Sequence, residues 1–249
     1  MNRATVNDVE SRPYRIMEWA MMTPLASLVL GATMFVLFGG LTAWFGGSSG
    51  TVTSSGGGAG ALVGVAVAGF IGPVLLLVLA GVLFSTSLLT IVIAVYFDAK
   101  TLETADIGWR PNPLPFLLVT LFFQPFVFYY LYKRHEYVVD WVDSGRWGTV
   151  AVGSLVLSTL LAGVGLVVEF VLWQPGLAMV LVSLGVIALA PFPYAVYRDT
   201  TYVRLNSESW QPNPGVTFPA ALVSLFLPFG YLLVGGYYLY KRRKALGTG

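Results

Sequence analysis

The chain has 249 residues, of which 56% are hydrophobic and only 10% are charged, whereas soluble domains carry about 25% charged residues. No Asp, Glu, Lys, Arg or His occurs from Trp19 to Phe97, and a water-facing fold could not bury so long an uncharged run. The chain has no cysteine, which excludes thiol chemistry and disulfides, and only one histidine, His135, which excludes a histidine-rich metal centre. The net charge of +2 does not suggest a nucleic-acid surface. The composition therefore predicts an integral membrane protein without a cofactor.

Six hydrophobic segments follow one another along the chain. They cover residues 23–45, 73–97, 114–132, 149–172, 176–197 and 217–240, and each is close to the roughly 20 apolar residues that cross a bilayer as a helix. The first segment starts too late and is too long for the apolar part of a signal peptide. We therefore expect residues 1–14 to be retained as a cytoplasmic tail.

A loop rich in Gly and Ser separates the first two segments. Residues 53–58 read Thr-Ser-Ser-Gly-Gly-Gly, a composition typical of flexible, exposed chain. We expect residues 46–60 to form an exposed loop.

The two halves of the chain share a series of motifs, which indicates an internal duplication. The motifs are Ala-Val-Tyr-x-Asp ending at Asp98 and Asp199, Trp-x-Pro-Asn-Pro starting at Trp109 and Trp210, and Tyr-Tyr-Leu-Tyr-Lys-Arg starting at Tyr129 and Tyr237. They predict two copies of a three-segment unit, at 15–135 and 149–244, joined by an interfacial connection at 136–148 and followed by a tail at 245–249. The first copy carries an extracytoplasmic insertion of about 25 residues, at about 46–70.

Two topologies fit this all-helical fold. Six spans would make the copies inverted, as in many secondary transporters, and would place nine of the fourteen basic residues in the cytoplasm. Alternatively, Pro125 and Pro228 break the third segment of each copy, so that it re-enters and only four segments span. All fourteen basic residues would then be cytoplasmic, in line with the positive-inside rule. Both topologies place the N-terminus and C-terminus in the cytoplasm.

Asp98 and Asp199 end their segments, where a carboxylate opposes the helix dipole unless a cation compensates it. We predict that each aspartate pairs with the Lys-Arg of its own copy, Lys133-Arg134 or Lys241-Arg242. The six-span topology conflicts with this pairing, because it places Asp98 and Lys133 on opposite sides of the membrane. The alternative is an ordinary solvated charge beside the membrane.

The Trp-x-Pro-Asn-Pro motifs, with Trp109, Asn112, Trp210 and Asn213, lie between the second and third segments of each copy. Proline fixes its own φ and favours extended geometry in the residue before it. The motif thus predicts a stiff entry into the next helix, with Trp at the interface and Pro near the first turn.

Glu169 is the only ionisable residue inside a predicted segment. Such a residue is a functional candidate by default, but its place near the end of the segment also allows it to reach the interface.

The tyrosines at 129–132 and 237–240 resemble an aromatic belt with snorkelling cations. Apolar residues at 137–142 predict a short interfacial helix.

The succession from Asp98 through Trp-x-Pro-Asn-Pro to Tyr-Leu-Tyr-Lys-Arg-His, ending at His135, resembles segments of small multi-pass membrane proteins of haloarchaea. These proteins have no assigned biochemical activity. The resemblance covers the second half of each copy, with Arg243 in place of the histidine. It implies the cell membrane of a prokaryote and supplies no catalytic residues.

We therefore expect a duplicated multi-pass membrane protein with no intrinsic catalysis, acting as a structural, regulatory or interaction component of the membrane. The first alternative is a small transporter or channel with its path between the copies, and the second is a membrane enzyme that borrows a cofactor. The expected partners are membrane lipid, a second copy of the chain or another membrane protein, and no nucleic acid.

Overall fold

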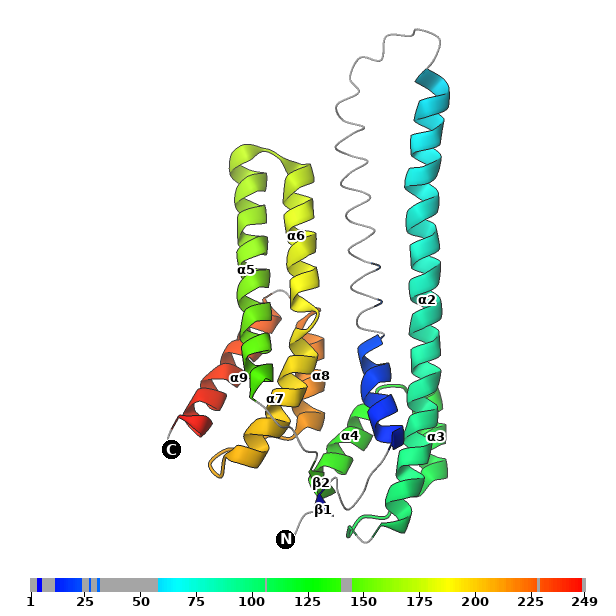
Figure 1. Cartoon of the computed structure of the whole chain (residues 1–249), viewed down its shortest axis with the longest axis vertical. Coiled ribbons are helices and arrows are strands. Elements are labelled where there is room, and N and C mark those ends of the chain that lie inside the picture. The colour runs from blue at the N-terminus through cyan, green and yellow to red at the C-terminus, as the bar shows by residue number, and fades with distance from the viewer. Residues whose placement is uncertain are drawn as a thin grey trace. The chain divides into compact units, whose positions relative to one another are not determined.

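The computed structural model describes residues 4–5, 12–23, 27, 31, 58–105, 107–139, 145–227 and 229–247 (Figure 1). Residues 12–23 are helical. The named elements are β1 (Ala4–Thr5), α2 (Gly58–Thr104), α3 (Pro113–Phe122), α4 (Phe126–Tyr137), β2 (Val138–Val139), α5 (Arg146–Leu172), α6 (Pro175–Leu189), α7 (Phe192–Asn206), α8 (Pro214–Ser224) and α9 (Gly230–Leu246). The predicted all-helical class is thus confirmed for the described residues, apart from two strands of two residues each.

Three described helical stretches are long and apolar enough to cross a membrane. They are Leu77–Thr104, Arg146–Leu172 and Pro175–Asn206, and they correspond to the predicted second, fourth and fifth segments. Most of the predicted first segment, 23–45, lies outside the described residues. Many large apolar side chains on these helices are exposed, including Phe170 at 72%, as expected where lipid is the solvent.

The chain divides into two compact units, and the second consists of 24–85 and 156–190. Small residues bring α5 and α6 together there. A Cβ on Gly165 would lie 2.9 Å from Val182 Cγ2, and one on Gly185 would lie 3.1 Å from the Ser158 carbonyl oxygen. Close approach through glycine is the usual way in which membrane helices pack, because lipid gives no hydrophobic force between them.

The first unit consists of 1–23, 86–155 and 191–249. Its hydrophobic core lies between the 12–23 helix, the C-terminal end of α2 and the helices α4, α7 and α8. The core residues Met17, Val95, Leu102 and Leu131 are fully buried. The strands β1 and β2 pair in parallel, Ala4 with Val138 and Thr5 with Val139. All the polar contacts described in the next subsection lie within this unit.

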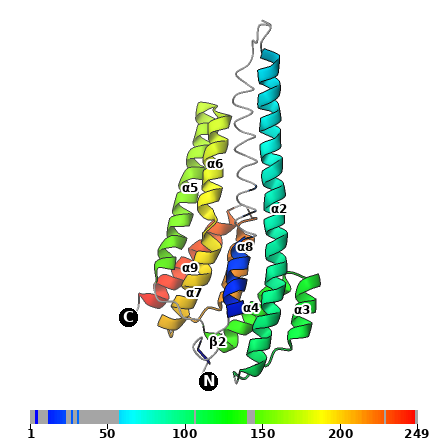
Figure 2. The same ribbon diagram turned by 45° about the vertical axis from the view of Figure 1, so that its right-hand side comes forward.

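The predicted third and sixth segments, 114–132 and 217–240, are each broken into two shorter helices (Figure 2). In the first copy, α3 ends at Phe122 and α4 begins at Phe126, after a turn in which Phe126 N–H donates to the Phe123 carbonyl oxygen. In the second copy, α8 ends at Ser224 and α9 begins at Gly230. With ten to twelve residues at about 1.5 Å each, α3 and α4 are each too short to cross a bilayer. A continuous kinked helix over 114–132 is therefore not formed.

Two local predictions were wrong. Residues 58–60, predicted as the end of the exposed loop at 46–60, are instead the start of α2. The run that follows them is rich in Ala and Val, and helix formation satisfies its backbone polar groups internally. Val138 and Val139, predicted as part of an interfacial helix, form β2 instead, in keeping with the preference of β-branched residues for extended geometry. Residues 46–57 and 140–144 lie outside the described residues.

Candidate functional site

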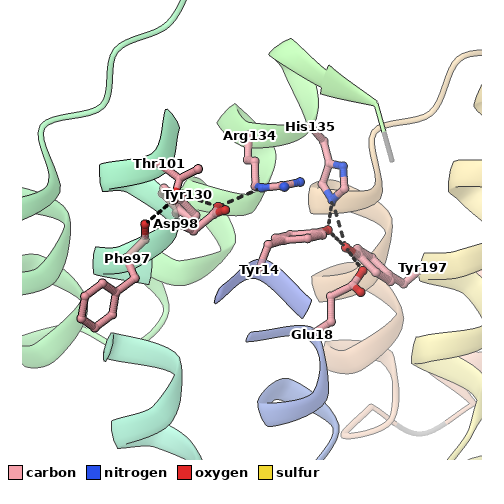
Figure 3. Close-up of polar contacts among 9 residues, drawn as sticks. All are labelled: Tyr14, Glu18, Phe97, Asp98, Thr101, Tyr130, Arg134, His135 and Tyr197. Atoms are coloured by element: carbon pink, nitrogen blue, oxygen red, sulfur yellow. Dashed lines mark hydrogen bonds and ion pairs between the residues drawn. The ribbon is translucent and has the colours of Figure 1, made fainter. Parts of the chain in front are cut away.

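Asp98 lies near the end of α2 and is fully buried. Its Oδ2 atom accepts two hydrogen bonds from α4, one from the Tyr130 hydroxyl at 2.6 Å and one from Arg134 Nε at 2.9 Å (Figure 3). Tyr130 and Arg134 are four residues apart and thus project from one face of the helix. We call Asp98, Tyr130 and Arg134 the Asp98 triad.

The same arrangement occurs around Asp199 of α7, which is also fully buried. Its Oδ2 atom accepts from the Tyr238 hydroxyl at 2.8 Å and from Arg242 Nε at 2.5 Å, both on α9. Arg242 also donates from Nη2 to the Gly145 carbonyl oxygen at 3.4 Å. We call Asp199, Tyr238 and Arg242 the Asp199 triad.

The predicted pairing of each aspartate with the Lys-Arg of its own copy is confirmed, and arginine is the partner in both cases. The solvated alternative is wrong for both carboxylates, because neither is exposed. Lys133 instead pairs with Glu136 at 2.9 Å on the surface, and Lys241 lies over the ring of Tyr237.

Two of the tyrosines that were predicted to form a belt are part of the triads. Tyr130 and Tyr238 are buried, at 0% and 3% exposure, whereas Tyr129, Tyr132, Tyr237 and Tyr240 are exposed. Burial, and then the neighbouring carboxylate charge, raise the pKa of Tyr130 and of Tyr238 well above the ordinary value. Both phenols therefore remain neutral hydrogen-bond donors at physiological pH.

Four further polar side chains meet beside the Asp98 triad, and we call them the polar junction: Tyr14, Glu18, His135 and Tyr197 (Figure 3). His135 Nε2 lies 3.1 Å from the hydroxyl oxygens of both Tyr14 and Tyr197. The two hydroxyls also contact each other, and the Tyr197 hydroxyl donates to Glu18 Oε1 at 2.9 Å. The junction joins the 12–23 helix, α4 and α7.

Arginines surround the polar junction. The guanidinium carbon of Arg134 lies 3.2 Å from the ring centroid of Tyr14, which connects the Asp98 triad to the junction. Arg204 Nη1 donates to the His135 carbonyl oxygen at 2.6 Å, and Arg198 pairs with Glu18 at 3.5 Å. Hydroxyl, imidazole and carboxylate groups that are hydrogen-bonded to one another can share a proton. The same contacts hold the 12–23 helix, α4 and α7 together.

The Trp-x-Pro-Asn-Pro motifs begin helices, as predicted. Pro113 is the first residue of α3 and Pro214 is the first residue of α8, and the asparagine before each accepts a hydrogen bond from a backbone N–H of the first turn. Trp109 stacks on Tyr137, and Trp210 contacts Tyr238.

The second motif makes one additional contact. Asn213 Nδ2 donates to the Tyr132 carbonyl oxygen at 3.1 Å. Beside it, a Cβ on Gly215 would overlap the backbone N and Cα of Tyr132, so glycine is required for α8 to approach α4 this closely. The corresponding residue of the first copy, Leu114, is 56% exposed.

The remaining predicted residues lie away from this cluster. Glu169 is partly exposed near the end of α5. Pro125 is the residue before α4, and Pro228 lies outside the described residues. Within the part of the chain that the structure describes, no group of three His, Asp or Glu side chains could hold a metal ion.

Sequence reasoning missed the polar junction. Tyr14 and Glu18 are four residues apart and so share a helix face, and His135 is the only histidine, but no pattern in the sequence indicates that they meet Tyr197. No protein-family model, curated protein or solved structure matches this chain.

Proposed function

We propose that the chain is a multi-pass membrane protein without intrinsic catalysis that acts as a structural, regulatory or interaction component of a prokaryotic cell membrane. The observation that carries this proposal is the pair of buried triads, in which Asp98 and Asp199 bind arginine and tyrosine side chains of the chain itself. Each carboxylate accepts hydrogen bonds from a neighbouring helix, so the triads connect helices of the chain to one another.

The proposed topology has four spanning segments and two re-entrant helix pairs, α3 with α4 and α8 with α9. It is supported by the short lengths of α3 and α4 and by the contact of Arg134 with the end of α2. An α4 that ended across the membrane from Asp98 could not make this contact. The topology places both tails and all fourteen basic residues in the cytoplasm.

The proposed duplication is parallel. Each copy contains an aspartate at the end of a long helix, an asparagine that caps the next helix, and a tyrosine and an arginine four residues apart on the last helix. These matching contacts support the duplication that the shared sequence motifs indicate. The resemblance to haloarchaeal membrane proteins supports a location in a prokaryotic cell membrane. The proposed partners are membrane lipid, a second copy or another membrane protein.

Cysteine accessibility tests the topology, because the natural chain has no cysteine. Single cysteines at positions 104, 140 and 205, probed with a membrane-impermeant maleimide, are expected to be labelled from the cytoplasm in all three cases. Labelling of position 104 alone from that side would establish inverted copies and contradict the proposal.

Reconstitution tests the function. Vesicles that contain the purified chain are expected to conduct protons and small ions no faster than empty vesicles, as measured with a pH-sensitive dye and a potential-sensitive dye. A flux that Glu169→Gln abolishes would contradict the proposal and establish a transporter instead.

A further inference from the structure

Thr120 differs from other helical serines and threonines of this chain in how its hydroxyl group is used. Thr90, Ser154 and Ser183 each donate to the carbonyl oxygen four residues earlier, as such side chains commonly do within helices. Thr120 lies on α3 and is fully buried, but its Oγ1 atom has no hydrogen-bond partner among the described residues. A buried hydroxyl without a partner destabilises a fold, so we expect a bound group to meet it.

A second oxygen of this kind lies four residues further along, in the break between α3 and α4 (Figure 2). It is the Gln124 side-chain oxygen Oε1, which is buried and has no partner in the described part of the chain. An amide oxygen can only accept hydrogen bonds or bind a cation. Thr120 and Gln124 thus place two buried oxygens at the end of one short helix.

The backbone adds three further oxygens at this end of α3. The helical hydrogen bonds stop where Phe123 N–H donates to the Val119 carbonyl oxygen, and Phe126 N–H then binds the Phe123 carbonyl oxygen. Pro125 has no N–H to donate. No backbone N–H of the described residues reaches the carbonyl oxygens of 120–122, the last three residues of α3. Carbonyl groups at a helix C-terminus attract positive charge.

The corresponding break of the second copy satisfies its own polar groups. The carbonyl oxygens of 222–224, the last three residues of α8, accept from the three backbone N–H groups that follow. The Ser224 hydroxyl donates to the Ala221 carbonyl oxygen at 2.7 Å. Leu227 takes the place before the proline that Gln124 takes in the first copy. A broken apolar helix in this chain can therefore pair the oxygens of its last turn, and α3 does not.

We propose that the end of α3 binds a monovalent alkali-metal cation, with Thr120 Oγ1, Gln124 Oε1 and the carbonyl oxygens of the last turn as its ligands. All of these ligands are neutral oxygens. Neutral carbonyl oxygens coordinate Na⁺ and K⁺ in channels and in the broken helices of transporters, whereas protein sites for Mg²⁺ and Ca²⁺ include carboxylates. The bound cation holds the turn between α3 and α4 in place.

The surroundings of the break favour a bound ion over bulk water. Phe122 and Phe123 are 84% and 59% exposed, and in a membrane such side chains face lipid, which cannot hydrogen-bond a carbonyl group. The inference rests on the proposed function in this one respect, namely that lipid surrounds the break.

Cation-dependent thermal stability tests this site. The full chain, purified in an uncharged detergent without alkali-metal salts, is titrated with sodium chloride or potassium chloride, and its unfolding midpoint is followed. Choline chloride and magnesium chloride are the controls at matched ionic strength. A ligand that binds only the folded state raises the midpoint as its concentration increases. Sodium or potassium is expected to raise the midpoint, and choline and magnesium are expected to have little effect.

Two variants locate the effect. Thr120→Val removes the hydroxyl at similar volume, and Gln124→Leu introduces the residue that precedes the proline in the second copy. Each is expected to raise the dissociation constant of the alkali-metal cation about tenfold or more, because a ligand of a charged group is lost. Ser224→Ala changes the corresponding residue of α8 and is expected to retain the wild-type response.

Stability without the cation separates a loss of binding from a loss of folding. In choline chloride alone, Thr120→Val is expected to be at least as stable as the wild type, because it removes a buried hydroxyl that has no partner there. If Thr120→Val does not fold, Gln124→Leu, at a partly exposed position of the turn, provides the test.

Four results would overturn the inference: an equal rise with choline chloride, a larger rise with magnesium chloride, no rise with any salt, or an unchanged response to the alkali-metal cation in the variants that fold. The absence of any rise would assign the unpartnered oxygens to bound water instead. These results leave the proposed function intact, since a chain that inserts into phosphatidylcholine vesicles remains a membrane protein. Failure to insert into any vesicle would instead contradict the proposed function.

Discussion

A buried carboxylate is tolerated in an apolar interior only where its charge is met by hydrogen-bond donors and a cation. Asp98 and Asp199 satisfy this condition in the same way, with a tyrosine hydroxyl and an arginine Nε on one carboxylate oxygen. The two triads differ in their exposure to solvent, because the side chain of Arg134 is 1% exposed and that of Arg242 is 25% exposed.

This difference predicts unequal effects of removing the two carboxylates. Asp98→Asn removes the charge that the buried Arg134 Nε binds, and the free energy of unfolding is expected to fall by about 3–5 kcal/mol. Asp199→Asn is expected to cost less, because Arg242 can reach water. Denaturant unfolding in mixed micelles measures both effects. Glu136→Gln, which removes an exposed pair, is the control and is expected to leave stability nearly unchanged. A larger loss for Asp199→Asn than for Asp98→Asn would contradict this explanation.

The buried tyrosines predict a loss of stability at alkaline pH. In the unfolded chain, tyrosines ionise near pH 10, whereas in the folded chain the pKa of Tyr130 and that of Tyr238 lie higher. The folded state therefore holds these protons more tightly, and its stability is fully present below about pH 10 and decreases as the pH rises above that value. The unfolding midpoint as a function of pH measures this decrease. The double variant Tyr130→Phe, Tyr238→Phe is expected to show a shallower decrease, and Tyr132→Phe, at an exposed position, is expected to behave as the wild type does.

At the scale of elements, close packing of α8 against α4 depends on a single glycine. The Asn213 side chain caps α8 and also binds the Tyr132 carbonyl oxygen, which places the N-terminus of α8 directly against the backbone of α4. In the first copy the corresponding helix start carries Leu114, which is exposed. The two helix starts thus share their capping chemistry and differ in the surface that they contact.

Gly215→Ala is expected to destabilise the chain by about 1–3 kcal/mol, because the new methyl group would overlap backbone atoms that cannot move aside. Gly236→Ala in α9 is the matched control, since nothing lies within 4 Å of its Cβ position. That change is expected to leave stability unchanged or to raise it by up to about 1 kcal/mol through helix propensity. Thermal unfolding of the two variants measures the difference, and equal midpoints would show that the α4–α8 contact is looser than described.

At the scale of the first unit as a whole, the polar junction connects segments that are far apart in the sequence. Tyr14 contacts His135 and Tyr197, which follow it by 121 and 183 residues. The 12–23 helix thus contacts both α4 and α7, and through Arg134 it also contacts the Asp98 triad.

A double-mutant cycle tests this coupling. Tyr14→Phe and Tyr197→Phe are expected to be non-additive, with an interaction free energy of about 0.5–3 kcal/mol, because the two hydroxyls share one network. Tyr14→Phe combined with Tyr238→Phe is the control, and the effects of these two changes are expected to add, because Tyr238 binds Asp199 instead. The free energies of unfolding of the single and double variants provide the measurement. Additivity in the first cycle would contradict the description of the junction as one network.

Features set by local chemistry were predictable from the sequence. The apolar helices follow from composition, the helix starts at Pro113 and Pro214 follow from proline geometry, and the pairing of Asp98 and Asp199 follows from the need of each carboxylate for a cation. The choice between lysine and arginine was left open by the sequence; in the structure Arg134 shares a helix face with Tyr130 and binds Asp98, whereas Lys133 pairs with Glu136 on the surface.

Features that depend on long-range packing were not predictable in this way. Nothing in residues 12–23 indicates that Tyr14 and Glu18 meet Tyr197, because that contact depends on how α4 and α7 are placed. The aromatic-belt prediction was wrong for Tyr130 and Tyr238 for a similar reason. Composition alone does not distinguish a tyrosine that faces headgroups from its neighbour that faces a buried carboxylate.

The separation of the contacting residues along the chain also sets an order of events during synthesis. The Asp98 triad can form once 36 further residues have been made, and the Asp199 triad once 43 have been made. The 12–23 helix precedes both triads along the chain, but its contact with Tyr197 requires 183 further residues. Loop closure over such a distance is slow compared with local pairing. The order of synthesis therefore allows the Asp98 triad first, then the contact of Tyr14 with Tyr197, and the Asp199 triad last, because Tyr238 and Arg242 follow Tyr197 along the chain.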